Sequence, residues 1–387
     1  MVDFRLSEEH EALRQTVQEF ARTVIAPVIG DYYSRHAFPY EIISQMGKLG
    51  LFGLQFGEEC GGMGGDFLAF CVTLEELARV DSSVAITLEA GVGLGTTLIS
   101  RHGTDDQKRQ WLRPLVTGEA LAAFALTEPD AGSDAGAITT RAVLDESTDE
   151  WVINGSKAFI TNSGTDITSV IIVAAVTGAG ADGRREISTI VVPAGTAGLT
   201  VQPGYAKVGW CASDTHPLSF DDVRVPAANL LGERGRGLAQ FLRALDEGRI
   251  AIAAVATGLA QGCVDESVTY AGQRRAFGHR IAEFQAMQFM IADMETRVHT
   301  ARLAYYDAAA RLAAGENITR AAAIAKLHAS DVAVANARDA AQVHGGYGFM
   351  DEFPVGRFWR DAKILEIGEG TSEVQRMVIA RQLGLAA

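Results

Sequence analysis

The sequence of 387 residues contains few cysteines, and they form no recognisable motif. Its four cysteines lie far apart and include no C-x-x-C pair, which argues against a disulfide framework. Widely spaced thiols are typical of a reducing compartment, so we expect a cytoplasmic location. Cys211 lies in an expected loop of the middle region, and we assign it no role.

Motifs for metals and nicotinamide cofactors are also missing. No H-E-x-x-H sequence and no clustered Cys/His spacing is present, so no metal is expected. The glycine run at 91–96 falls short of G-x-G-x-x-G and follows no expected strand. The sequence therefore gives no support to a Rossmann nicotinamide site.

Long apolar runs and an excess of positive charge are absent as well. No apolar stretch approaches the ~20 residues of a membrane span, and the segment from Met1 to Arg5 does not resemble a targeting signal. The formal net charge is -14 at pH 7, whereas nucleic acids and anionic membranes bind cationic surfaces. We therefore expect neither as a partner, and a polyanionic ligand would need local arginines.

The hydrophobic pattern divides the chain into three parts. Its length exceeds the roughly 250–300 residues that a single core supports. Ser7 is expected to cap a first helix, in which apolar residues recur at helical spacing. Short β-rich runs follow between residues 151 and 220, and the helical period returns after Gly237. We predict a helical domain at 1–122, a β domain at 123–232 and a helical-bundle domain at 233–387.

Two short motifs carry the candidate chemistry. Near the C-terminus, the segment 368–376 places Glu369 beside a glycine and two hydroxyls at the start of an expected helix. This arrangement is typical of a base that acts on a carbon acid, but a first-turn carboxylate that stabilises a helix dipole is the commoner use of such a glutamate. Some 240 residues earlier, the segment 125–134 forms a turn rich in small residues, hydroxyls and backbone donors.

Together and in this order, the two motifs resemble the acyl-CoA dehydrogenase family, and the resemblance extends from Leu6 to Arg381. It implies an α+β multidomain fold, with an all-α N-terminal domain, a middle β-barrel-like domain and a C-terminal four-helix bundle. It also implies a flavoprotein of fatty acid β-oxidation that uses FAD to convert an acyl-CoA into the trans-2-enoyl-CoA. In this family the glutamate that corresponds to Glu369 removes the α-proton while a β-hydride passes to the flavin.

The family sometimes carries its base on another helix, directly before an arginine that corresponds to Arg249. That position is Gly248 here, and Glu247 is one residue away, which on a helix is a rotation of ~100°. We therefore assign the base to Glu369. Asp246 and Arg249 resemble the substrate pair of the family, although an ordinary surface ion pair is an equally good explanation of their spacing.

The resemblance assigns the remaining site residues. Thr127 and Ser133 have turn capping as an alternative role, and a solvated helix end is the alternative for Arg274. Many relatives carry tryptophan where this chain has Phe159. The flavin residues are Phe124, Leu126, Thr127, Gly132, Ser133, Phe159, Ile160, Thr161, Thr371 and Glu373, joined from a neighbouring subunit by Arg274, Phe277, Phe284, Gln285, Gln342, Val343, Gly345 and Gly346. The substrate residues are Ser133, Asp246, Arg249 and Gly370, whereas His344 is structural.

Gly368 replaces a tyrosine of several relatives, so we expect a short or short-branched acyl chain. The resemblance further implies a homotetramer and electron transfer to electron-transfer flavoprotein. Three alternatives stay open: an acyl-CoA oxidase on the same fold, a dehydrogenase whose thioester is carried by acyl carrier protein, and a non-catalytic acyl-CoA-binding module.

Overall fold

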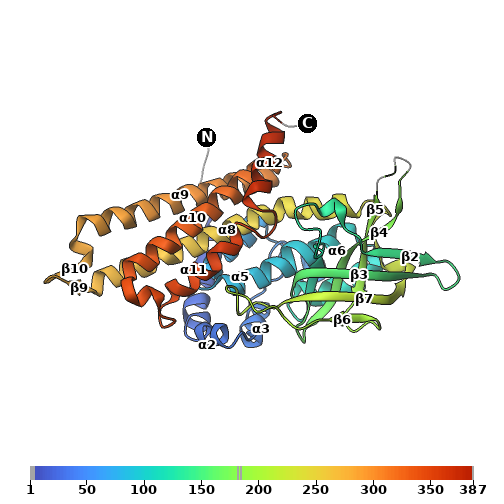
Figure 1. Cartoon of the computed structure of the whole chain (residues 1–387), viewed down its shortest axis with the longest axis horizontal. Helices are drawn as coiled ribbons and strands as arrows, with labels where there is room; N and C mark the ends of the chain where they lie inside the picture. Colours follow the sequence, from blue (N-terminus) through green and yellow to red (C-terminus); the bar gives the residue numbers. More distant parts are fainter. Residues whose placement is uncertain (1–4, 181–182, 184, 386–387) are drawn as a thin grey trace.

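The computed structural model describes residues 5–180, 183 and 185–385, so Met1 to Phe4, part of the segment in which no targeting signal was expected, lie outside the described residues. Figure 1 shows a sheet at one end of the molecule, a bundle of long helices at the other and shorter N-terminal helices between them. The predicted order of helical, β and helical regions is confirmed.

The N-terminal region is helical because its segments carry their own caps. The Oγ of Ser7 accepts from the backbone N–H of His10, and Asp66, Asp81 and Thr104 cap later helices in the same way. The helices are α1 (Glu8–Phe20), α2 (Ile29–Ser34), α3 (Tyr40–Lys48), α4 (Phe67–Ala78), α5 (Ser82–Leu88), α6 (Thr97–His102) and α7 (Asp105–Val116), with π-helices at Ala21–Ile25 and Glu89–Thr96.

The helical stretch Ser82–His102 corrects one expectation from the sequence. It is long and apolar enough by composition to cross a membrane, although no such stretch was expected. Every residue of its most apolar window is buried inside the protein, as in the core helix of a globular protein. The glycine run at 91–96 lies in the π-helical part of this stretch and follows no strand.

The middle region is one mixed sheet with the order β6-β7-β3-β2-β4-β5-β8, and β1 pairs with β4 in parallel. The long strand β3 is continuous, although bulges interrupt its pairing with β7. The strands are β1 (Leu121–Ala125), β2 (Arg141–Asp145), β3 (Glu150–Thr161), β4 (Thr168–Ala179), β5 (Arg185–Pro193), β6 (Leu199–Val201), β7 (Thr215–Pro226) and β8 (Leu230–Leu231).

The C-terminal region is built around the long helix α8, which runs from the sheet to the far end of the bundle (Figure 1). A Cβ at Gly258 would overlap the backbone oxygen of Glu75, so glycine permits α8 to lie close against α4. The helices are α8 (Gly237–Gln273), α9 (Gln285–Ala313), α10 (Thr319–His344), α11 (Pro354–Leu365) and α12 (Ser372–Gln382), and a hairpin of β9 (Arg275–Ala276) and β10 (His279–Arg280) joins α8 to α9.

Candidate active site

Glu369 lies in the turn between α11 and α12 and not in the first turn of α12. Thr371 is the N-cap of α12, since its hydroxyl accepts from the backbone N–H of Val374 at 3.3 Å. The backbone of Glu369 has a φ of 52°, a left-handed conformation that is strained for a side-chain-bearing residue. The helix-dipole role therefore belongs to Glu373, the acidic residue of the first turn, and not to Glu369.

The carboxyl group of Glu369 is buried, although the residue as a whole is partly exposed. Its Oε2 atom is shielded from solvent and makes no hydrogen bond to the described residues. Burial raises the pKa of Glu369, while contact with Glu89 and the charges of Lys326 and Arg249 oppose part of that rise. The result is a buried carboxyl with raised basicity and one free oxygen.

Lys326 holds the turn that carries Glu369. Its fully buried ammonium donates to the backbone oxygen of Gly370 at 2.8 Å, and the Gln375 amide donates to the same oxygen at 2.9 Å. Burial lowers the pKa of Lys326 to about 8. The signal in the sequence was a single lysine within the alanine-rich segment 319–344, and its role was not predicted.

Gly248 makes room for the Glu369 carboxyl. A Cβ at this position would clash with the Oε2 atom of Glu369. Some relatives carry their base at the position of Gly248. In this chain the Glu369 carboxyl occupies the space that such a side chain would fill. Glu247 is turned away from this place, because both of its carboxylate oxygens accept from Arg101 at 2.6 and 2.5 Å.

Asp246 and Arg249 form an ion pair on α8, as their spacing predicts. Arg249 is buried, and its Nε atom has no partner among the described residues. The second oxygen of Asp246 accepts from the hydroxyl of Thr319 at 3.1 Å. A buried arginine with a free donor beside Glu369 differs from an ordinary surface ion pair, so that alternative does not fit.

The turn at 125–134 leaves two hydroxyls available. Neither Thr127 nor Ser133 makes a side-chain hydrogen bond to the described residues, and Gly132 and Ser133 are exposed. The capping role is taken by Glu128, whose carboxylate accepts from the backbone N–H groups of Thr139 and Thr140 at 2.7 and 2.9 Å. Turn capping therefore does not account for the two hydroxyls. Phe124 and Leu126 pack inward, with the Phe124 ring against Phe241.

Lys157 and Glu128 form a buried ion pair beneath this turn, which the sequence analysis did not identify. Lys157 donates to Glu128 at 2.8 Å and to the backbone oxygen of Leu126 at 3.0 Å. Burial alone would raise the pKa of Glu128, but hydrogen bonds from Lys157 and the turn lower it to about 2. The pair fixes the turn against β3.

Phe159 is presented to solvent near the end of β3. Its backbone has a φ of 60°, its side chain is 64% exposed, and its ring stacks on Tyr205 with 5.0 Å between centroids. The side chain of Ile160 points the other way, into the core of the sheet, so a contact of this residue with a flavin would be made by its backbone. Thr161 ends the strand and is half-buried.

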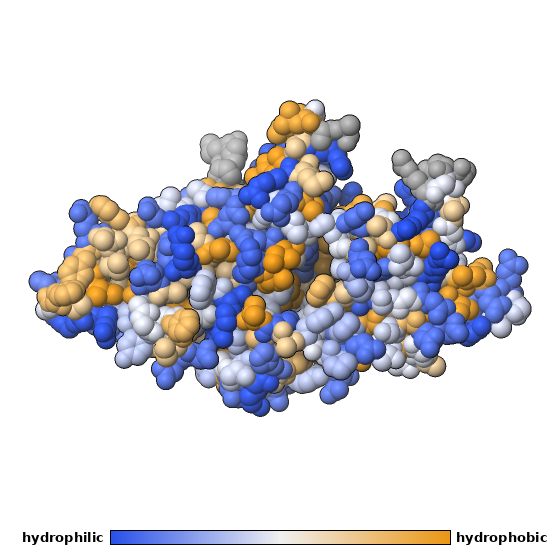
Figure 2. Space-filling model, viewed as in Figure 1, coloured by the Kyte–Doolittle hydropathy of each residue, from blue (hydrophilic) through white to orange (hydrophobic). Residues whose placement is uncertain are grey.

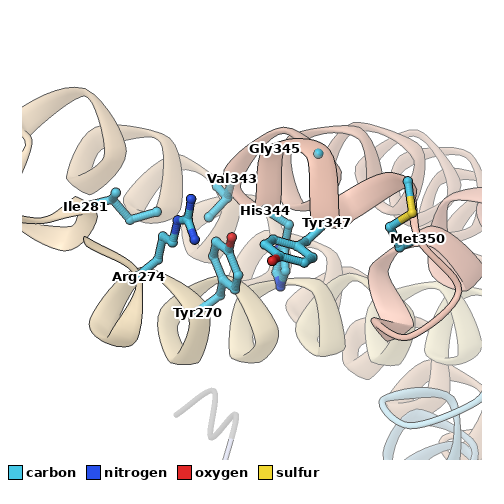
Figure 3. A pocket seen from close by; sticks show the side chains of 9 residues that line it. Tyr270, Arg274, Ile281, Val343, His344, Gly345, Tyr347 and Met350 are labelled. Carbon is cyan, nitrogen blue, oxygen red and sulfur yellow. The ribbon is translucent and has the colours of Figure 1, made fainter. Parts of the chain in front are cut away.

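The second group of predicted flavin residues lies at the far end of the bundle. Arg274, Val343, Gly345 and Gly346 line one pocket of about 540 Å³, together with Tyr270, Ile281, His344, Tyr347 and Met350 (Figure 3). A Cβ at Gly345 or Gly346 would meet no atom within 4 Å, so the backbone here is open to a ligand. Gln342 and Gln285 are exposed nearby at helix ends, Phe284 is half-buried, and Phe277 at the hairpin tip is 92% exposed.

His344 belongs to the wall of this pocket. Its ring stacks on Tyr270 at 4.2 Å between centroids, and its Nδ1 atom donates to the backbone oxygen of Ala340. Figure 3 shows Tyr270 between Arg274 and His344. This packing agrees with the structural role expected for His344.

The two groups of flavin residues are far apart within one chain. Residues 249 and 273 both lie on α8, and 24 residues of α-helix span about 36 Å. The hairpin and the sheet accordingly lie at opposite ends of the molecule in Figure 1. One chain therefore does not bring all the predicted flavin residues to a single site.

The buried base, the free hydroxyls of the 125–134 turn and the open glycines at the far end of the bundle are compatible with a flavin site shared between chains, and the comparisons define the class of protein as a three-domain flavin-dependent oxidoreductase. The acyl-CoA dehydrogenase N-terminal, middle and C-terminal domain patterns match residues 7–119, 123–223 and 235–384. The chain belongs to the acyl-CoA dehydrogenase family, and it is an oxidoreductase that acts on acyl-CoA with FAD as cofactor.

Several relatives match along nearly the whole chain. The short-chain specific acyl-CoA dehydrogenase of Clostridium acetobutylicum is 42% identical over 99% of this chain and 100% of its own. Butyryl-CoA dehydrogenase from Megasphaera elsdenii has a TM-score of 0.94 and 40% identity, covering 99% and 100% of the two chains. A chain from the work described as "Electron transferring flavoprotein of Acidaminococcus fermentans" has a TM-score of 0.95 and 41% identity, covering 99% of each.

One relative bears a name for the reverse reaction. The acryloyl-CoA reductase (NADH) of Anaerotignum propionicum is 41% identical over 99% of this chain and 96% of its own. The family therefore contains proteins named for both directions of α,β-chemistry on the acyl chain.

Proposed function

We propose that this protein dehydrogenates a short or short-branched acyl-CoA to the trans-2-enoyl-CoA, with Glu369 as the base that removes the α-proton. The observation that supports this most directly is the buried Glu369 carboxyl, which has a raised pKa and an oxygen without a partner. A carboxyl in such surroundings is a stronger base than one in water. When FAD is bound, it supplies the acceptor for the β-hydride.

The chain's own residues prepare the proton transfer. The charges of Lys326 and Arg249 favour the ionised form of Glu369, which burial alone would disfavour. The left-handed backbone of Glu369 and the bond from Lys326 to Gly370 fix the direction of the carboxyl. Arg249, which directly follows Gly248 on α8, and its partner Asp246 are the residues that would orient the thioester arm.

The expected substrate size follows from the walls around the base. A Cβ at Gly368 would meet only the backbone oxygen of Ile364 within 4 Å, at 3.5 Å, so a branch on the acyl chain has room on that side. Leu94 on the π-helix lies beside Gly248 and limits the space beyond the base. The named short-chain and butyryl-CoA relatives support the same size class.

We propose electron-transfer flavoprotein as the electron acceptor. The exposed ring of Phe159 stacks on the half-buried Tyr205 at the position where the family shields its flavin. A chain solved in the structural work on the electron transferring flavoprotein of Acidaminococcus fermentans has the same fold as this protein. Reduction of that acceptor, without a matching yield of hydrogen peroxide, separates this proposal from an acyl-CoA oxidase.

We also propose a homotetramer in which a neighbouring chain completes each flavin site. Apolar side chains gather at the end of the bundle near the hairpin (Figure 2), including Phe277, Phe289, Tyr347, Phe349 and Met350. Their exposure in one chain supports burial against a second copy. The four free thiols support the proposed cytoplasmic location.

An anaerobic titration of the purified protein tests the function. We expect butyryl-CoA and 2-methylbutyryl-CoA to bleach the oxidised flavin, and palmitoyl-CoA to bleach it least. Fastest bleaching by palmitoyl-CoA would overturn the short-chain proposal. A preference for acyl carrier protein thioesters would identify the biosynthetic alternative, and binding without bleaching by any thioester would identify a non-catalytic module.

The named acryloyl-CoA reductase makes the reverse direction the second candidate. The same titration, continued with crotonyl-CoA and pre-reduced protein, measures how readily the flavin is reoxidised by an enoyl thioester. Complete reoxidation by crotonyl-CoA with no bleaching by butyryl-CoA would favour a reductase.

A further inference from the structure

A second carboxyl lies against Glu369 and has no role in the function proposed above. Glu89 is the first residue of the π-helix Glu89–Thr96 and is fully buried. Neither of its oxygens accepts a hydrogen bond from an N–H or O–H group of the described residues. A buried carboxylate without such partners costs several kcal/mol, so the usual packing role does not account for a glutamate at this position.

The group that faces Glu89 is the carboxyl of Glu369. Two ionised carboxylates have no donor between them, whereas a proton on one supplies a hydrogen bond to the other. Burial and the nearby charge of Glu369 raise the pKa of Glu89 well above its ordinary value. Burial together with the facing carboxyls therefore favours a pair that shares one proton and one negative charge.

The surrounding charges decide which partner keeps the proton. Lys326 on α10 and Arg249 on α8 act on Glu369 and favour its ionised form. Cys71 on α4 lies near Glu89, and its thiol is neutral because burial raises its pKa well above the ordinary value. Among the described residues, no cation contributes to the pKa of Glu89, so the proton belongs on Glu89 and the charge on Glu369.

Glycines on two helices leave space for the two carboxyls. A Cβ at Gly93, one helical turn after Glu89, would lie 2.9 Å from its Oε1 atom. A Cβ at Gly248 would clash with the Oε2 atom of Glu369. Two independent elements thus accommodate the facing carboxyls, which is more than the chance burial of one glutamate.

We propose that Glu89 is a positioning residue for the base: its protonated carboxyl donates a hydrogen bond to the Glu369 carboxylate and keeps that carboxylate ionised and aimed in the resting enzyme. This inference rests on the proposed function, since it assigns Glu369 as the base. After Glu369 has accepted the substrate's α-proton, the pair holds two protons and no charge.

The pH dependence of kcat/KM, which reports groups of the free enzyme, tests the proposal with matched variants. Glu89→Leu removes the donor at nearly constant size, so the acid limb should move upward by about one pH unit, a roughly tenfold loss of rate on that limb. Glu89→Gln keeps an N–H donor and should restore the limb most of the way. Glu76→Gln, a buried carboxyl of α4 that pairs with Arg14 and Arg79, should leave it unchanged.

A second readout does not depend on turnover. Infrared difference spectra of the holoenzyme should show the carbonyl band of a protonated buried carboxylic acid near neutral pH. We expect the band to disappear in Glu89→Leu and in Glu89→Gln, and to persist in Glu76→Gln. Persistence of the band in both Glu89 variants, or an acid limb that moves equally in the leucine and glutamine variants, would overturn the proposal.

These outcomes distinguish the two claims. If no thioester reduces the wild-type flavin but the infrared band depends on Glu89, the proton-sharing pair stands and the proposed function fails. If butyryl-CoA reduces the flavin and neither the acid limb nor the band depends on Glu89, the function stands and the positioning role fails.

Discussion

Two buried carboxyl groups of this protein, Glu128 and Glu369, have opposite properties. Glu128 accepts from Lys157 and from two backbone N–H groups, so its pKa falls to about 2 and it is a fixed structural anion. Glu369 has an oxygen without a partner, and burial raises its pKa. Since the residue type is the same, the difference shows that satisfied hydrogen bonds make a carboxyl inert, while incomplete satisfaction leaves it available for chemistry.

The largest expected effect concerns the carboxyl that lacks a partner. Glu369→Gln should retain FAD and acyl-CoA but reduce the rate of flavin reduction by roughly 10³–10⁴-fold, because the amide cannot accept the α-proton. Stopped-flow bleaching with butyryl-CoA measures this rate. The matched change Glu128→Gln should lower the stability of the protein but leave the rate of flavin reduction per folded, flavin-loaded site nearly unchanged. An equal loss of this rate in both variants would remove the contrast between the two groups.

A second prediction breaks the satisfied pair. Lys157→Met should lower the free energy of unfolding by about 3–5 kcal/mol, because it leaves Glu128 buried without its cation. The double variant Glu128→Gln with Lys157→Met should recover part of the loss, as it removes the uncompensated charge. Urea unfolding monitored by circular dichroism gives both values, and a single variant as stable as the wild type would contradict the assignment.

A third prediction moves the Glu369 carboxyl without changing its chemistry. Gly248→Ala places a methyl group where the Oε2 atom lies, so flavin reduction should slow by about 10²-fold with no comparable loss of bound FAD. Gly30→Ala on α2 is the control, since its methyl group would lie away from the substrate wall and meet only the Arg357 guanidinium, at 3.9 Å. Equal rates in the two alanine variants would show that Gly248 does not determine the position of the base.

The smallest effect concerns the pH dependence of stability. The folded pKa of Glu128 lies below its ordinary value, so its contribution to stability is complete above that ordinary value and is lost as pH falls towards about 2. The pKa of Glu89 is raised, so its burial costs stability as pH rises. Thermal melts should thus show that Glu89→Gln becomes more stable relative to wild type as pH rises into the alkaline range. On acidification, the melting temperature of Glu128→Gln should fall less than that of wild type.

The sequence was sufficient to predict the parts of the molecule that depend on local patterns. The cap at Ser7, the order of helical and β regions and the membership of the family followed from spacing and motifs. The assignment of Glu369 to a helix start was two residues too early, because the true cap is the hydroxyl of Thr371. Gly370 has a φ of 94° and lies outside the helix, but nothing in the neighbouring sequence showed that the helix begins only after Thr371.

The contacts around the base were not predicted, because they join residues that are distant in the sequence. Glu89 lies 280 positions before Glu369 and two residues before the glycine run at 91–96, which was considered only as a nucleotide-binding motif. Lys326 stands in an alanine-rich helix, where its long side chain would ordinarily reach solvent. Glu128 and Lys157 lie on neighbouring elements of the middle region, and only the folded turn brings their charges together.

Exchange of the substrate's α-proton tests the central claim most directly. A saturated acyl-CoA analogue that cannot be oxidised is incubated in D₂O with the holoenzyme, and deuterium at the α-carbon is measured by mass spectrometry for wild type and Glu369→Gln at equal occupancy. We predict rapid exchange by the wild-type protein and exchange reduced to the solvent rate in the variant. Undiminished exchange by Glu369→Gln would contradict the assignment of Glu369 as the base.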